Sequence, residues 1–118
     1  EATDRVSSIE KEIGLKRVTR ATHLSLKKSC SLISQASILI SPDSGPMHIA
    51  GALRIPTVSI FGSTDHVQTC QWGNERSAIV RHDLPCAPCM KRTCPLKHHN
   101  CMKLIKSVDV LSAIDSLN

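Results

Sequence analysis

The chain has 118 residues, of which 41% are hydrophobic and 2% are aromatic, and its formal net charge is +5. The hydrophobic content predicts one globular domain, or part of one, and excludes an intrinsically disordered chain. Scarce aromatics disfavour single-strand nucleic-acid binding, and no apolar run is long enough to cross a bilayer. The positive charge favours an anionic partner, although on charge alone a solvated basic surface explains it better.

The pattern at the start of the chain is not the one expected of an export signal. Residues Glu1 to Glu12 are charged and amphipathic, unlike a signal peptide, and the first residue is not Met, as expected of a fragment or a processed chain. We therefore expect a cytoplasmic setting. There the six cysteines would be thiols, metal ligands or catalytic groups and not disulfides.

The first third of the chain predicts two helices. Apolar residues recur at helical spacing from Asp4 to Ile13, and Gly14 is a natural stop. A short strand is expected around Arg17 to Thr19. Ser25 can then cap a second helix. Its apolar face would consist of Leu26, Cys30 and Ile33.

The middle of the chain alternates strands, turns and a helix. The apolar run Ile38 to Ser41 predicts a buried strand of a parallel sheet, and Pro42 to Pro46 predicts a sharp turn. A small-residue helix is expected from Met47 to Leu53, ended by the Ile55-Pro56 pair. The next strand is expected at Thr57 to Phe61, followed by a turn from Gly62 to Asp65.

The last third predicts one strand, one loop and one helix. Ala78 to Val80 is expected to form a strand, and the cysteine-rich, proline-rich segment from Cys86 to Cys101 is expected to be an irregular loop. An amphipathic helix begins near Ser107. The alternation of elements predicts an α/β fold with a layered parallel sheet, in which residues 1–118 form one domain or part of one.

The turn at Asp43 has the features of an anion site. Open α/β sheets bind ligands beyond the carboxyl ends of their strands, and the N-terminus of the following helix suits a phosphate. Gly45 leaves room for a ligand beside the backbone, Pro46 suits a first helical position, and His48 lies in the first turn. Taken alone, the turn is explained better by Asp43 or Ser44 capping the helix, with His48 as an ordinary surface residue.

The longer string from Ser41 to Asp65 closely resembles the signature of the bacterial heptosyltransferase family, glycosyltransferase family 9. That signature is an Asp-Ser/Thr-Gly, two residues and a His, then an Ala-rich helix, a Pro, a hydrophobic strand and a Phe-Gly-x-Thr-Asp turn, which here is Phe61 to Asp65. The cysteine-rich segment and the C-terminal helix also have counterparts in the family. The resemblance begins near Leu24. Before it, Ala21-Thr22-His23 stands where the family usually has a Gly-Lys-Thr-like stretch.

This resemblance implies the C-terminal, donor-binding part of a GT-B enzyme, which has two Rossmann-like halves. The donor would be a nucleotide sugar, typically ADP-heptose, and the acceptor the lipopolysaccharide core, bound by the N-terminal half at the cytoplasmic face of the inner membrane. Transfer would invert the anomeric carbon, with the general base in the N-terminal half. The resemblance therefore implies no catalytic residue in this chain and no turnover by the chain alone. The first strand of the donor half also has no counterpart here.

The resemblance also assigns binding roles. Ser44 and Gly45 would present backbone N–H groups to the donor diphosphate. His48 would hydrogen-bond a phosphate, and Asp43 would fix the loop and the donor sugar. Further candidates for lining the same cleft are Ser63, Thr64 and Asp65.

Four cysteines are spaced closely enough to converge on one metal ion, and tetrahedral zinc is the chemical expectation. They are Cys86, Cys89, Cys94 and Cys101, with His82, His98 and His99 as spare ligands. The spacing lacks the paired knuckles of a zinc ribbon, so three interpretations stay open: a structural zinc site, reduced thiols packing a loop, and disulfides formed by oxidant. A catalytic metal is not expected, because four thiolates leave no open position, and the family chemistry implies no catalytic cofactor.

Two other classes of function remain as alternatives. One is a different sugar-nucleotide enzyme of the same two-domain fold, such as an epimerase, which the string from His48 to Asp65 fits less well. The other is a small zinc-binding module that contacts nucleic acid. The α/β pattern and the Asp43 to His48 motif disfavour it, so we expect no nucleic-acid partner.

Overall fold

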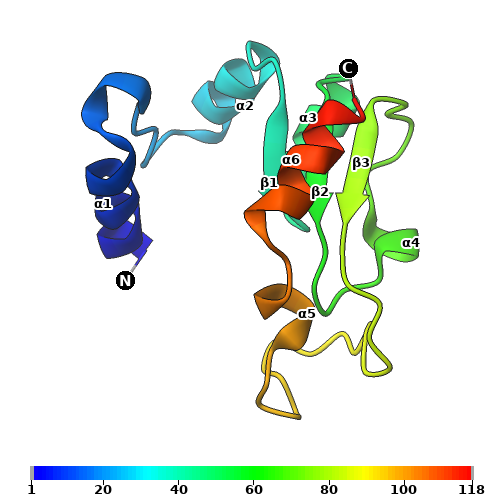
Figure 1. The fold of residues 1–118 in the computed structure, drawn as a ribbon. Coiled ribbons are helices and arrows are strands. Elements are labelled where there is room, and N and C mark those ends of the chain that lie inside the picture. Colours follow the sequence, from blue (N-terminus) through cyan, green and yellow to red (C-terminus); the bar gives the residue numbers. More distant parts are fainter. Residues whose placement is uncertain (1, 118) are drawn as a thin grey trace.

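A computed structural model describes residues 2–117 and confirms an α/β architecture around a parallel sheet (Figure 1). The three strands have the order β1-β2-β3 and span Leu39–Pro42, Thr57–Ile60 and Ser77–Val80. Both pairings are parallel, and the register places Pro42 opposite Ile60 and Ile60 opposite Val80. The carboxyl ends of all three strands therefore lie at one edge of the sheet.

Helices cover the sheet. Helix α3 (Gly45–Ala52) contacts β1 and β2, and helix α6 (Ser107–Asp115) contacts β2 and β3. Figure 1 shows α6 crossing in front of the strands. Successive residues of β2 point to opposite faces, yet Thr57, Val58 and Ser59 are all buried, so both faces of β2 are covered.

The core is small and mostly aliphatic, as the scarcity of aromatics predicts. Its buried hydrophobic side chains are Met47, Ala50, Val58, Phe61 and Val80. They come from α3, β2 and β3 and from the residue that follows β2. The same elements that form the core therefore also fix the loops at the carboxyl edge of the sheet.

The first two helices lie beside this unit. Helix α1 (Ala2–Ile13) ends at Gly14, whose φ of 86° is in the left-handed region that glycine favours. Helix α2 (Leu26–Ser34) begins after Ser25, whose side chain accepts a hydrogen bond from Lys28 N at 3.4 Å. Figure 1 shows α1 standing away from the sheet. Both helices and their boundary signals agree with the sequence prediction.

The strand predicted at Arg17 to Thr19 is wrong. A short 3-10 helix, η1, occupies Leu15–Arg17, and Val18 is extended at φ −127° and ψ 130°. Extended backbone becomes a strand only when a neighbour pairs with it, and within residues 2–117 the sheet holds β1, β2 and β3 alone. The sequence therefore predicted the extended conformation of Val18 correctly, but the predicted strand does not form.

The structure also differs from the prediction at helix α3 and in two further segments. Helix α3 begins at Gly45, two residues before the expected Met47, because Ser44 is the extended N-cap and the helix accepts a proline in its first turn. It ends at Ala52, where Arg54 adopts a left-handed φ of 55° and donates to Gly51 O. Two short helices were not predicted from the sequence. They are α4 (His66–Thr69) and α5 (Asn100–Lys103), and α5 takes up the end of the cysteine-rich segment.

Candidate functional site

The carboxyl ends of β1 and β2 form one side of a cavity of about 270 Å³. Pro42 and Ile60 are paired in the register, so the residues that follow them are adjacent in space. Asp43 follows β1, and Ser63 and Thr64 lie in the turn after β2; all three line the cavity. The structure thus brings together three of the residues singled out from the sequence, at the edge where α/β sheets bind ligands.

Asp43 is held in place by a residue that sequence reasoning missed. The Thr69 hydroxyl lies 2.8 Å from Asp43 Oδ2 and 2.9 Å from the carbonyl oxygen of Asp65, so its one proton is shared between them. Thr69 is in α4, and Asp65 Oδ1 caps that helix by accepting from Val67 N at 2.9 Å. Asp65 therefore organises α4 and does not line the cavity, unlike Ser63 and Thr64.

The beginning of α3 is open to a ligand. The Ser44 side chain caps no backbone N–H and interacts instead with Ser41 Oγ at 3.1 Å and the Pro42 carbonyl at 3.2 Å. At Gly45 an added Cβ would meet no atom within 4 Å. The backbone N–H groups at this helix start are thus neither capped by Ser44 nor crowded at Gly45, which is the arrangement an anion requires.

His48 lies apart from the cavity. Its side chain is exposed and lines a separate hollow with Arg54 and Trp72. Trp72 is 94% exposed, so it does not pack its loop against the sheet. The His48 ring has no hydrogen-bond partner among the described residues, so the side chain is free to change rotamer.

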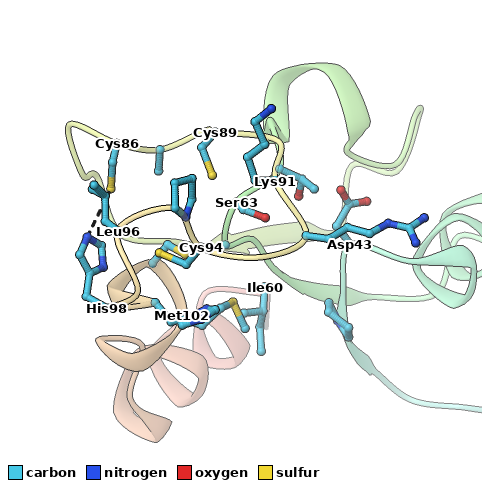
Figure 2. Close-up of a pocket in the computed structure, with 18 residues that line it drawn as sticks. Asp43, Ile60, Ser63, Cys86, Cys89, Lys91, Cys94, Leu96, His98 and Met102 are labelled. Carbon is cyan, nitrogen blue, oxygen red and sulfur yellow. Dashed lines mark hydrogen bonds between the residues drawn. The ribbon is translucent and has the colours of Figure 1, made fainter.

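The cysteine-rich segment forms the opposite wall of the cavity. The four clustered cysteines all contribute to this wall, together with His98. Figure 2 shows Cys86 and His98 at the end of the cavity away from Asp43. Cys86 Sγ lies 4.0 Å from His98 Nε2. Within the described residues, no group of three or more His, Cys, Asp or Glu side chains is placed to hold a metal ion. Zinc binding would therefore require this segment to rearrange, and it stays a prediction.

The backbone around one thiol in this wall lowers the pKa of that thiol. The pKa of Cys94 is lowered from its ordinary value, chiefly by the backbone N–H of His99, with smaller contributions from the N–H groups of Leu96, His98 and Lys97. Desolvation acts in the opposite direction but does not cancel these hydrogen bonds. Lys97 and His99, two of the residues whose N–H groups lower this pKa, both have positive φ, at 58° and 56°.

Two contacts fasten the segment to the turn after β2. The backbone N–H of Met90 donates to the Ser63 carbonyl at 2.8 Å. Gly62 leaves room for the Met102 side chain, whose sulfur would lie 2.5 Å from a Cβ at that position. The glycine of the Phe-Gly-x-Thr-Asp turn therefore permits the close approach of α5 to the sheet.

Sequence comparison with known proteins identifies the family to which the chain belongs. The sequence model of glycosyltransferase family 9 (heptosyltransferase) matches residues 1–100. The chain is 41% identical over 118 residues, its whole length, to lipooligosaccharide heptosyltransferase 2 of Campylobacter jejuni serotype O:6. The chain therefore belongs to glycosyltransferase family 9, the heptosyltransferases, in agreement with the resemblance drawn from Ser41 to Asp65.

More distant relatives cover less of the chain. Lipopolysaccharide heptosyltransferase 1 of Pseudomonas aeruginosa is 38% identical over 82 residues, which is 69% of this chain and 22% of the relative. Lipopolysaccharide heptosyltransferase 3 of Escherichia coli is 33% identical over 87 residues, or 74% of this chain and 25% of the relative. The chain spans 37% of the length of its Campylobacter relative. No solved structure matches it significantly.

Proposed function

We propose that this chain is the donor-binding part of a GT-B heptosyltransferase and that it binds a nucleotide sugar, ADP-heptose. The observation that carries the proposal is the cavity at the carboxyl ends of β1 and β2, where Asp43 is held by Thr69 next to the open start of α3. The choice of donor and acceptor is supported by two relatives, a lipooligosaccharide heptosyltransferase 2 and a lipopolysaccharide heptosyltransferase 1.

Each part of the site suits one part of such a donor. The backbone N–H groups of Ser44 and Gly45 would donate to the diphosphate, which the positive end of the α3 dipole also favours. The Asp43 carboxylate would accept hydrogen bonds from sugar hydroxyls, and the Ser63 and Thr64 side chains lie on the same cavity wall. His48 would reach a phosphate after a rotamer change, since its present position is outside the cavity.

The chemistry proposed is inverting displacement at the anomeric carbon. The acceptor hydroxyl attacks, a base removes its proton, and the diphosphate leaves with the former glycosidic bonding electrons. The chain would stabilise the departing diphosphate, which is an electrostatic contribution, while the base and the lipopolysaccharide-core site would belong to the N-terminal half of the full enzyme. We therefore propose that this chain holds no catalytic residue and does not turn over alone.

The enzyme would act on a lipid-linked acceptor at the cytoplasmic face of the inner membrane. Within the described residues, no helix combines the length and the apolar character needed to cross a bilayer. We propose peripheral association with that membrane through the acceptor.

A calorimetric titration with ADP, with UDP as the control nucleotide, tests the proposal. We expect ADP-selective binding that weakens in Asp43→Asn and His48→Ala. Stronger binding of UDP would favour another sugar-nucleotide enzyme, such as an epimerase. Absence of binding in a folded sample would contradict a donor site in this chain.

A further inference from the structure

Two cations from the cysteine-rich segment lie on the wall of the donor cavity. Lys91 and Arg92 both line it, together with Asp43 and Ser63 from the strand ends. Figure 2 shows Lys91 on the same side of the cavity as Ser63 and Asp43, away from Cys86 and His98. Both cations were absent from the residues singled out in the sequence, because they are far from the strand ends along the chain.

The fold holds these cations at the strand ends. Met90, the residue before Lys91, donates its backbone N–H to the Ser63 carbonyl at 2.8 Å. The end of the segment is fastened separately, by Met102 against Gly62 and by His82 Nε2, which lies 2.9 Å from the Leu104 carbonyl. The backbone at Lys91 is thus positioned relative to the turn after β2.

Neither cation is neutralised by any residue that the structure describes. Among the described residues, the Lys91 and Arg92 side chains form no ion pair or hydrogen bond. The charged residues of the lining are these two cations and one carboxylate, Asp43, which already accepts a hydrogen bond from Thr69. The lining therefore has more positive than negative charge, and its single carboxylate already accepts a hydrogen bond. This arrangement favours binding of an anion with more than one negative charge.

We propose that Lys91 and Arg92 form a second binding arm for the donor, and that this arm binds the diphosphate in addition to the backbone N–H groups at the start of α3. The proposal rests on the proposed function, because it assumes that the cavity holds a nucleotide diphosphate. A guanidinium fork and an ammonium group both bind phosphate oxygens, the first with bidentate geometry. Asp43 would then face the sugar hydroxyls while the arm neutralises the leaving diphosphate.

The test uses inorganic pyrophosphate and ADP as probes on the full chain. The double variant Lys91→Gln with Arg92→Gln removes both charges. Lys97→Gln is the matched control, since Lys97 is an exposed cation of the same segment that does not line the cavity. We expect the double variant to bind both probes at least about tenfold more weakly, with a weaker dependence on salt, and the control to bind as the wild type does. Far-UV circular dichroism confirms that the variants are folded.

Each outcome decides the question. Weakened binding in the double variant alone supports the arm. If the double variant binds each probe as tightly as the wild type does, the proposed arm is wrong, and the proposed donor site is not affected. Equal weakening in the double variant and in Lys97→Gln would show a general charge effect and also overturns it. If the folded wild type binds neither probe, the donor site and the arm both fall.

Discussion

Replacement of Gly45 by alanine separates a ligand role of this glycine from a structural one. Gly45 is the first residue of α3, its φ lies outside the left-handed region, and an added Cβ would meet no protein atom within 4 Å. The fold therefore does not need glycine here. If a phosphate approaches the backbone at this point, the same empty space is needed by the ligand.

The magnitudes follow from these two facts. Alanine at a compatible position restricts the unfolded chain, so Gly45→Ala should raise the free energy of unfolding by about 0.4–1 kcal/mol. The methyl group would push the diphosphate away from the N–H groups at the helix start. A shift of this kind should weaken ADP binding by about tenfold, which corresponds to about 1.4 kcal/mol.

Gly51→Ala supplies the matched control in the same helix. An added Cβ there would lie 2.9 Å from Cβ and from Oε1 of the buried Gln71, so this variant should lose about 1–3 kcal/mol of stability by overpacking. Urea denaturation followed by circular dichroism gives both stabilities, and calorimetry gives the affinities. The reasoning is refuted if Gly45→Ala destabilises the chain, or if it is stable and binds ADP as tightly as the wild type.

Three further predictions concern the site and its cysteine-rich wall. The nearly isosteric variant Thr69→Val removes the hydrogen-bond partner of Asp43. It should lower the free energy of unfolding by about 1–3 kcal/mol in denaturant titrations and should also weaken ADP binding. Unchanged ADP affinity would argue against Asp43 as a ligand. Because the pKa of Cys94 is lowered, iodoacetamide should alkylate Cys94 at lower pH than Cys30 or Cys70, as measured by mass spectrometry. Labelling of all three cysteines at the same pH would contradict this prediction. Metal analysis of freshly reduced protein should find one zinc per chain if the cysteines bind it, and no zinc would reject that hypothesis.

The centre of the fold was predictable because its sequence signals are local. Short apolar runs bounded by turn residues marked β1 and β2, and the Asp-Ser-Gly turn with its following proline marked the start of α3 to within two residues. These signals also located Asp43, Ser63 and Thr64 at strand ends, and a parallel sheet then places strand ends side by side.

The rest depended on contacts between distant segments. Thr69 reaches Asp43, and Lys91 reaches the cavity, only because α4 and the cysteine-rich segment dock on the strand ends. No periodicity in the sequence encodes that docking. Helix α4 has four residues, too few for a helical pattern, although its Asp65 cap was visible as a turn residue. The place of His48 in the motif also did not predict that its side chain lines a separate hollow.

Amide chemical-shift mapping of the chain during an ADP titration tests the donor site most directly. The account predicts that the largest shifts occur at Ser44 and Gly45, at the start of α3, and at Ser63 and Thr64, which line the cavity. Shifts centred on Arg54 and Trp72, or no shifts in a folded sample, would contradict it.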